Sequence, residues 1–288
     1  MYLSSEQLIS PILRQPIGTR GVSSLLEHGS GELNEDVLLE NTNLYGVFDG
    51  STSLDKRRFQ DGKTGGLLAA GTAAQSFRDS RLPLVQEAEK ANIKIQQAQL
   101  SEDIDVTDRH LLWSTSLAVI RLEEDRFEYC QTGDALILLI KKDGSYKLVT
   151  PDIDIDRETL ILWKKAKEST DGALQRQLGE QIRKVRLTMN VSYGVLNGEP
   201  EALRFINHGY EDLTDVSDIL LFTDGLHLPR ANPSEGHDWH LFVQLYRLGG
   251  LQAVHDFVRG VQDQDPDCRQ YPLFKCHDYI AAVAISCP

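Results

Sequence analysis

The stretch from residue 113 to 150 constrains the fold more than any other part of this sequence. It reads WSTSLAVIRLEEDRFEYCQTGDALILLIKKDGSYKLVT, in which four β-prone runs are separated by turn-forming dipeptides. The dipeptides are Glu124-Asp125, Gly133-Asp134 and Asp143-Gly144. Short runs of this kind, joined by tight turns, pair with their neighbours in the antiparallel sense. The stretch therefore predicts a meander of antiparallel strands.

The rest of the chain adds strands in groups and helices in blocks. Further strands are predicted at 44–48, 203–207, 218–223 and 279–286, with an earlier one at 22–27 or at 36–40. Helical spacing of apolar residues predicts helices at 64–80, 84–100, 157–167, 238–248 and 250–262. Because strands and helices do not alternate strictly, we expect an α+β fold in which antiparallel sheets carry helices on their outer faces.

No internal repeat or low-complexity linker divides the sequence, and we interpret residues 1–288 as a single domain. Within it, residues 151–198 form the least regular segment, which we expect to be an excursion on the surface. The hydrophobic content of 41% and the charged content of 25% are those of an ordinary soluble protein.

The net charge excludes some classes of partner. It is −13, from 30 basic and 43 acidic residues, and such a surface repels the phosphates of nucleic acids and anionic membranes. No stretch approaches the roughly 20 apolar residues that span a bilayer, and the N-terminus lacks the pattern of a secretory signal. We therefore expect a cytoplasmic protein that binds neither nucleic acid nor membrane.

Two matches to ligand-binding motifs fail on inspection. The GKT at 62–64 has Arg57 where a phosphate-binding loop requires its first glycine. The DIDID at 152–156 begins like a calcium-binding loop, but Arg157 and Trp163 replace the required glycine and glutamate. A solvated acidic loop is the favoured interpretation of the second segment.

Acidic residues stand at the ends of five predicted strands. They are Glu35-Asp36 in LNEDVLL, Asp49-Gly50 in LYGVFDGSTSL, Asp134 in QTGDALILLI, Asp224-Gly225 in ILLFTDGL, and Asp278 in CHDYIAAVAIS. Mg²⁺ and Mn²⁺ prefer carboxylate and water oxygens, and two such ions about 4 Å apart activate a water between them. A glycine after the aspartate lets the backbone turn sharply and brings its carbonyl close to an ion. A single Asp-Gly more often marks a turn, so the hypothesis of a metal centre rests on the set.

The order of these motifs resembles one enzyme family. NED, VFDG, TGDA, LLFTDG and HDYIAAVAI follow one another as in the metal-dependent protein serine/threonine phosphatases of type 2C, also called the PPM family. The resemblance runs from about residue 20 to the C-terminus. It implies an αββα four-layer sandwich, in which two antiparallel sheets are flanked by helix pairs, and it places the family's mobile flap at 151–198.

The resemblance also implies a binuclear Mg²⁺ or Mn²⁺ centre. Asp49 would bridge both ions, and the carbonyl of Gly50 would hold one of them. Asp224 and Asp278 would hold the other ion. Asp134 matches the aspartate that helps bacterial members to hold a third, weaker ion.

Two further carboxylates, Glu35 and Asp36, would lie beside the ions and order bound water. The implied catalytic set is Asp36, Asp49 and Asp224. In this chemistry the cations neutralise the phosphate monoester, lower the pKa of a bound water and align it for in-line attack, without a covalent phosphoenzyme. The implied substrate is a phosphorylated protein in a signalling pathway, or a small phosphate ester.

The sequence departs from the family where the substrate is handled. The phosphate-gripping arginine that precedes N-E-D in many members is absent from EHGSGEL, and Arg20 lies well upstream. Ser51 follows Asp-Gly where eukaryotic members have a histidine, and Tyr279 replaces the asparagine of the final D-N. His227 follows Asp224 closely, but we interpret it as a solvent-facing loop residue. An alternative is therefore a weak or inactive regulatory module that binds metal or a phosphorylated partner.

Overall fold

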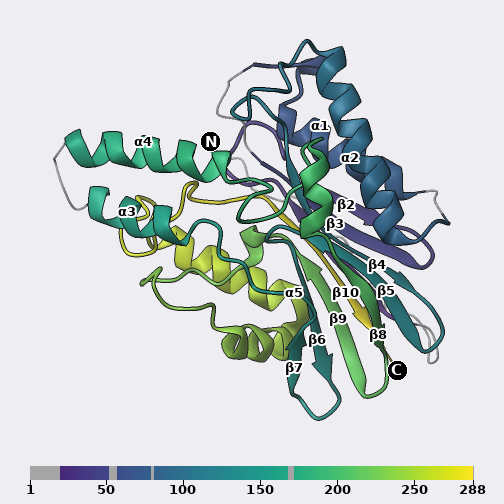
Figure 1. The fold of residues 1–288 in the computed structure, drawn as a ribbon. Helices are drawn as coiled ribbons and strands as arrows, with labels where there is room; N and C mark the ends of the chain where they lie inside the picture. Colours follow the sequence, from purple (N-terminus) through teal and green to yellow (C-terminus); the bar gives the residue numbers. More distant parts are fainter. Residues whose placement is uncertain (1–19, 52–56, 79–80, 168–171, 288) are drawn as a thin grey trace, which may run out of the picture.

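Two five-stranded antiparallel sheets form the centre of the protein (Figure 1). The computed structural model describes residues 20–51, 57–78, 81–167 and 172–287. The first sheet has the order β1 (Val22–Glu27), β10 (Ile280–Ser286), β9 (Val216–Phe222), β6 (Leu136–Lys141), β7 (Tyr146–Leu148). The second has the order β2 (Val37–Glu40), β3 (Leu44–Gly50), β4 (Thr115–Leu122), β5 (Arg126–Thr132), β8 (Asn207–Asp212). The predicted α+β class with two antiparallel sheets is confirmed.

Helices cover the outer face of each sheet. Helices α1 (Gly65–Arg78) and α2 (Leu84–Ser101) pack on the β2–β8 sheet, and α5 (Trp239–Asp263) packs on the β1–β7 sheet. Helix α5 is interrupted at Gly249 and Gly250, where the sequence predicts the boundary between two helices. Helices and sheets therefore form four layers.

No described helix combines the length and the apolar composition that a membrane span needs.

The alternation of side chains along the strands builds the three apolar layers. In β3, Leu44 and Phe48 face α1 and α2, whereas Tyr45 and Val47 face the opposite sheet. Successive side chains of a strand point to opposite faces, so a strand that is apolar at every position must be covered on both sides. The LYGVF run is therefore a sequence signal for a strand at the middle of a layered fold.

The stretch 113–150 is not one meander, as the sequence predicted. Its first two strands, β4 and β5, belong to one sheet, and β6 and β7 belong to the other. The chain crosses at Gly133, whose φ of +79° favours glycine and whose Cβ, if present, would lie 2.3 Å from that of Ser116. Both hairpins satisfy the same local pattern, so the pattern cannot reveal which sheet each one joins.

Other segments correct the sequence prediction in detail. Both candidates for the first strand exist, as β1 and β2, whereas the strand predicted at 203–207 is wrong: Pro200–Phe205 forms a 3-10 helix and β8 begins at Asn207. In the 151–198 segment, α3 (Arg157–Lys167) confirms its prediction, and α4 (Gly172–Leu187) was not predicted. These two helices lie against each other and stand out from one end of the sandwich (Figure 1).

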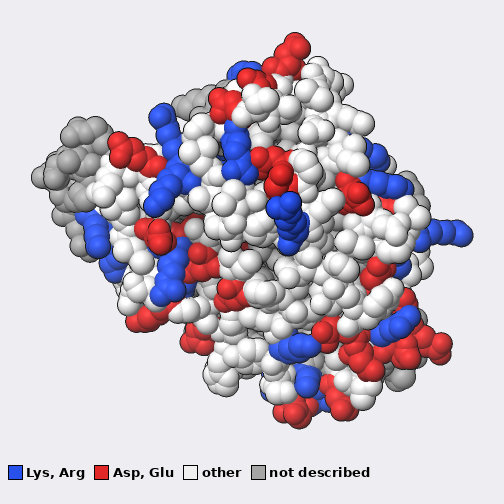
Figure 2. Space-filling model, in the orientation of Figure 1, with Lys and Arg blue, Asp and Glu red and all other residues white. Residues whose placement is uncertain are grey.

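The surface around α3 and α4 carries charges of both signs. Figure 2 shows Lys and Arg interspersed with Asp and Glu over this face, without a continuous basic patch on it. Such a surface offers little to a polyanion, in agreement with the negative net charge of the chain.

Candidate active site

The strand register gathers acidic residues at the ends of neighbouring strands, on one side of the β2–β8 sheet. Asp36 precedes the first residue of β2, and that residue pairs with the one before Asp49. Asp49, near the end of β3, pairs with Ser116 of β4. The hydroxyl of Ser116 donates a 2.8 Å hydrogen bond to the carboxylate of Asp134. Three predicted site residues are therefore neighbours because adjacent strands run in opposite directions.

The other sheet brings its acidic residues to the same edge. Strands β9 and β10 are antiparallel, so Asp224, just after β9, lies near Asp278, just before β10. The two sheets are joined there, because the hydroxyl of Thr223 donates a 2.7 Å hydrogen bond to Oδ2 of Asp36. Acidic strand ends from both sheets thus meet at one end of the sandwich.

A cavity of about 400 Å³ opens at this meeting point. Five of the predicted residues line it: Asp49, Gly50, Asp134, Asp224 and Asp278. The other two, Glu35 and Asp36, lie outside its lining and are buried, with 1% and 5% of their surface exposed. The fold therefore brings five of the seven predicted residues to the wall of one cavity.

Gly50 is required by its close surroundings. A Cβ at this position would lie 2.5 Å from the carbonyl oxygen of Gly66 and 2.6 Å from that of Glu35. Any side chain would push β3 away from the start of α1. The backbone of residue 50 can consequently approach the cavity where a larger residue could not.

The carboxylates repel one another. Burial raises the pKa of Asp36, Asp49 and Asp224 well above the usual value, and neighbouring aspartates raise it further. Burial also raises the pKa of Asp134, although its hydrogen bond with Ser116 opposes the shift. The ionised forms of these buried acids destabilise one another, and a bound cation would relieve this repulsion.

Helices α3 and α4 supply the opposite wall of the cavity. Ile182, Val185 and Arg186 come from α4, and Thr159 comes from α3. Arg186 and Lys275 are the basic residues that line this cavity. Sequence reasoning missed both, because neither belongs to a motif and α4 itself was not predicted.

Arg20 does not compensate for the missing phosphate-binding arginine. Its guanidinium donates 3.0 Å hydrogen bonds to the carbonyls of Glu123 and Glu124, in the turn between β4 and β5. That turn lies at the other end of the strands from Asp49 and Asp134.

The DIDID segment is not the solvated loop that the sequence predicted. Asp152 accepts a 2.8 Å hydrogen bond from the indole of Trp239, and Asp154 forms a 2.7 Å ion pair with Arg230. Asp156 lines the cavity, and burial, reinforced by the charge of Asp134, raises its pKa to about 7. The three aspartates of this segment, which alternate with isoleucines, therefore lie in three different environments. The composition of the segment could not indicate this.

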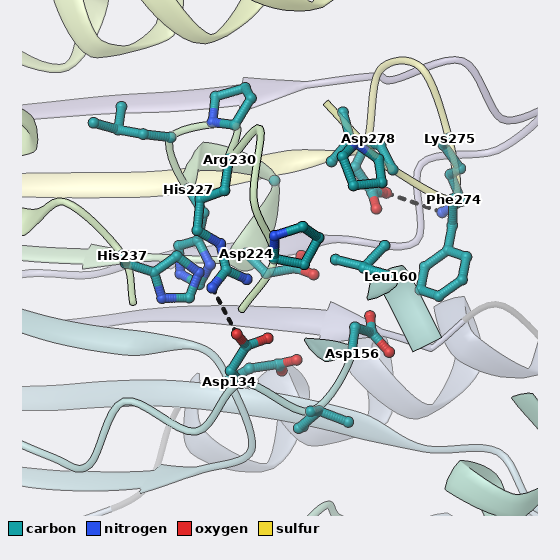
Figure 3. A pocket seen from close by; sticks show the side chains of 18 of the residues that line it. Asp134, Asp156, Leu160, Asp224, His227, Arg230, His237, Phe274, Lys275 and Asp278 are labelled. Atoms are coloured by element: carbon teal, nitrogen blue, oxygen red, sulfur yellow. Dashed lines mark hydrogen bonds and ion pairs between the residues drawn. The ribbon is translucent and has the colours of Figure 1, made fainter. Parts of the chain in front are cut away.

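A smaller cavity of about 100 Å³ adjoins the first (Figure 3). Both cavities share Asp134, Asp156, Asp224, Lys275 and Asp278. On its far side lies His227, whose ring packs against Phe222 and Trp239. Burial and the nearby His237 lower the pKa of His227 well below its usual value. The prediction of a solvent-facing histidine is wrong, and the neutral ring has a packing role.

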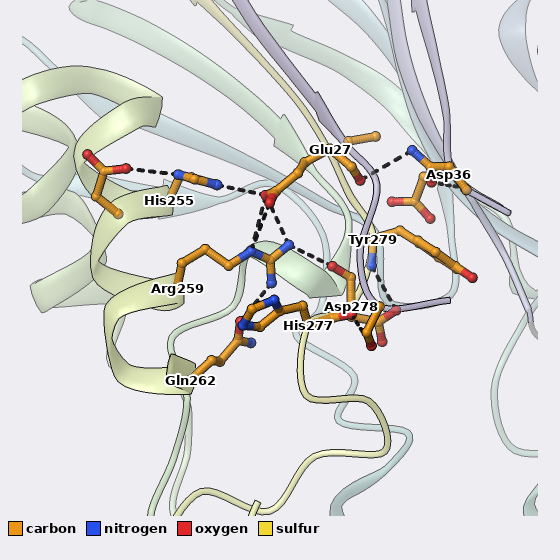
Figure 4. Close-up of polar contacts among 12 residues, drawn as sticks. Glu27, Asp36, His255, Arg259, Gln262, His277, Asp278 and Tyr279 are labelled. Carbon is orange, nitrogen blue, oxygen red and sulfur yellow. Dashed lines mark hydrogen bonds and ion pairs between the residues drawn. The ribbon is translucent and has the colours of Figure 1, made fainter. Parts of the chain in front are cut away.

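A polar network holds the loop that carries Asp278 (Figure 4). Arg259, on α5, donates a 2.7 Å hydrogen bond to the carbonyl of Asp278 and forms a 3.0 Å ion pair with Glu27 of β1. His255, one turn earlier on α5, contacts Glu27 at 2.7 Å. The network connects α5 and β1 with Asp278, two residues before β10. It therefore holds the backbone of one candidate ligand in place from the side of α5.

The comparison with protein families supplies the decisive observation. A family model described as protein phosphatase 2C matches residues 28–249, which is well over half of the chain and includes four of the five acidic strand ends. The chain belongs to the protein phosphatase 2C family. A search of curated protein sequences finds no match.

Solved structures of bacterial phosphatases share the phosphatase 2C fold with this chain. The Mycobacterium tuberculosis serine/threonine phosphatase PstP/Ppp has a TM-score of 0.56 at 15% identity, covering 93% of this chain and 98% of that one. The Staphylococcus aureus serine/threonine phosphatase Stp1 has a TM-score of 0.54 at 14% identity, covering 94% and 96%. The catalytic domain of PstP in complex with two manganese ions has a TM-score of 0.55 at 15% identity, covering 93% and 97%. Identities this low show a common fold.

The donor chemistry of this phosphatase 2C site suits hard divalent cations. The lining carboxylates offer only oxygen as a ligand atom, and burial, reinforced by the neighbouring carboxylates, raises the pKa of Asp49 and of Asp224. Among the described residues, however, no group of three or more His, Cys, Asp or Glu side chains is gathered closely enough to hold an ion. The ligand types therefore fit the metal, while the side chains stand apart.

Proposed function

We propose that this chain is a metal-dependent phosphatase that hydrolyses phosphoserine, phosphothreonine or related phosphate monoesters. The observation that carries the proposal is the meeting of acidic strand ends from both sheets around one cavity, where burial and mutual repulsion raise the pKa of Asp49 and of Asp224. Family membership supports a phosphatase, and the two manganese ions of the PstP complex support the choice of metal.

The proposed ligands are those that the sequence indicates. Asp49, the Gly50 carbonyl, Asp224 and Asp278 would hold two Mg²⁺ or Mn²⁺ ions, and Asp134 would help to hold a third. Bound ions would supply a water of lowered pKa and would neutralise the phosphate. Glu35 and Asp36 would hold water molecules in place from their buried positions.

The substrate phosphate would enter between the carboxylates and α4. Arg186 is placed for this role, because it lines the cavity and its guanidinium can bind phosphate through two parallel hydrogen bonds. In the structure its Nη1 lies 3.4 Å from the hydroxyl of Ser114. Apolar side chains of α4 beside it would shield the reacting groups from bulk water.

Hydrolysis of a generic aryl phosphate tests the function. We expect activity that requires Mn²⁺, that EDTA removes, and that Asp224→Asn lacks. Activity in EDTA, or full activity of the Asp224→Asn protein, would contradict the proposed site.

The second candidate is a regulatory module that binds metal or a phosphorylated partner without efficient hydrolysis. The separation of the candidate ligands favours it, as does the absence of an arginine just before Asn34-Glu35-Asp36. Mn²⁺ binding by calorimetry without measurable hydrolysis would select this candidate.

A further inference from the structure

The ammonium of Lys275 is held against a proposed metal ligand. Its Nζ lies 3.0 Å from Oδ1 of Asp278 and 4.0 Å from the centroid of the Tyr279 ring. Only 23% of the side chain is exposed. A carboxylate and an aromatic face together form favourable surroundings for an ammonium. These contacts fix Lys275 in the wall of the acidic cavity (Figure 3).

Lys275 also neutralises part of the charge that a metal ion would neutralise. Its positive charge lowers the pKa of Asp36 and of Asp49, against the burial and the neighbouring carboxylates that raise them. Burial alone would lower the pKa of Lys275, but the nearby Asp278 outweighs it and raises that pKa above the usual value. An ammonium that is paired with a carboxylate at 3.0 Å is charged at neutral pH.

The position of this ammonium conflicts with metal binding at Asp278. Oδ1 of Asp278 accepts hydrogen bonds from Lys275 and, at 2.9 Å, from the backbone N–H of Tyr279. A cation that took this oxygen as a ligand would have to replace the ammonium, because two positive charges on one carboxylate oxygen repel each other strongly at short range. The carbonyl of Asp278 is bound to Arg259, which keeps the backbone of the loop in place during such an exchange.

We propose that Lys275 is a tethered competitor for metal, which occupies Asp278 in the metal-free protein and leaves it when ions bind. The inference rests on the proposed metal-dependent function and adds a control of metal affinity that this chain carries in its own sequence. Only molecules in which Asp278 is free of Lys275 can bind the ion at this ligand. The apparent dissociation constant of the site is therefore the intrinsic one divided by the fraction of such molecules. If that fraction is about one in ten, the apparent dissociation constant is about tenfold higher than the intrinsic one.

The test is Mn²⁺ binding to the whole protein, measured by calorimetry. For Lys275→Met we expect a dissociation constant at least about tenfold lower than that of the wild type. Lys275→Gln, a second neutral variant, should shift in the same direction, and Lys275→Arg should bind like the wild type. Lys147→Met is the matched control: it removes the same charge, but from a surface pair with Glu211 at 2.8 Å, and should leave Mn²⁺ affinity unchanged.

Thermal unfolding gives a second readout. Without metal, Lys275→Met should melt at a lower temperature than the wild type, because Asp278 loses its counter-charge. With Mn²⁺, its melting temperature should rise by more than that of the wild type, since tighter binding to the folded state stabilises it more. A lysine with only a structural role would give the first effect without the second.

The result that overturns the inference is Mn²⁺ binding by both neutral variants that is no tighter than wild-type binding. If the wild type then still hydrolyses aryl phosphate in a manner that needs Mn²⁺ and Asp224, only the inference has failed. If neither the wild type nor the variants bind Mn²⁺, the proposed function has failed with it.

Discussion

Arg259 donates a hydrogen bond to the backbone carbonyl of Asp278 at 2.7 Å, from a helix that forms the outer layer of the sandwich. The same guanidinium is paired with Glu27 of β1. The position of a candidate metal ligand is thus set by α5 and β1, and no described residue of these two elements lines the 400 Å³ cavity. Arg259 is a positioning residue, and its effects on stability and on metal binding can be separated.

Replacing Arg259 should destabilise the protein. In Arg259→Met, Glu27 and the carbonyl of Asp278 lose a charged donor, and we expect the free energy of unfolding to fall by about 2–3 kcal/mol. Urea unfolding monitored by circular dichroism measures it. Arg126→Met provides the control, since its pair with Glu123 is exposed and should contribute much less. Equal effects of the two substitutions would contradict the role of the network.

The same network should make stability depend on pH in two directions. Burial alone would raise the pKa of Glu27, but hydrogen bonds from His255 and Arg259 outweigh burial and lower this pKa from 4.5 to about 2. Its contribution is therefore full above pH 4.5 and is lost as the pH falls towards 2. The hydrogen bond with Glu27 raises the pKa of His255 above 6.5, so that contribution is full below 6.5 and is lost as the pH rises through the folded-state value.

Unfolding free energies of the wild type and of Glu27→Gln, measured from pH 2 to 9, test this assignment. The difference between the two proteins should be largest between about pH 4.5 and 6.5 and should shrink on both sides. A difference that is constant across the range would show that Glu27 acts through packing alone.

The sequence predicted the layers of the fold because burial on both faces leaves a local signal. LYGVF and ILLF are apolar at successive positions, as strands between two packed layers must be, and β3 and β9 lie within a residue or two of their predictions. The order of the sheets could not be predicted this way. The crossing at Gly133 joins two hairpins with the same local pattern, and pairing between distant strands leaves no trace in either of them.

Some residues of the candidate site can likewise be predicted from local sequence, whereas others depend on tertiary structure. Asp49, Asp224 and Asp278 are recognisable because each stands at the end of an apolar strand and belongs to an ordered set of motifs. Arg186 and Asp156 lie in the segment between β7 and β8, and they reach the cavity only because α3 and α4 fold back over it. Their roles depend on tertiary placement, which neither residue type nor spacing encodes.

Removing a carboxylate from the cavity should have opposite effects on activity and on the stability of the metal-free protein. Asp49→Asn and Asp224→Asn should each reduce Mn²⁺-dependent hydrolysis by at least about a hundredfold, since a ligand matters more than its supporting groups. Because burial and neighbouring charges raise the pKa of both aspartates, the ionised side chains destabilise the folded state at neutral pH. The asparagine variants should therefore melt at the same or a higher temperature without metal. A large loss of stability would instead assign these residues to the core.

Arg186 should govern substrate binding more than turnover. For Arg186→Met we expect KM for an aryl phosphate to rise by about 10- to 150-fold, the equivalent of one charged hydrogen bond, with a smaller change in kcat. Arg183→Met, on an exposed position of the same helix, is the control and should behave like the wild type. An unchanged KM in Arg186→Met would remove this arginine from the proposed site.

The cavity should favour small phosphate esters over phosphopeptides. It holds about 400 Å³, and Ile182, Val185 and Phe274 form an apolar wall that an aryl group can contact. A peptide substrate must place its backbone outside this wall, and the arginine that grips the substrate phosphate in many family members is absent before Asn34. We therefore expect a lower KM for p-nitrophenyl phosphate than for a phosphothreonine peptide under the same Mn²⁺ concentration. Tighter binding of the peptide would show that residues outside the cavity recognise the substrate, and would shift attention to the exposed faces of α3 and α4.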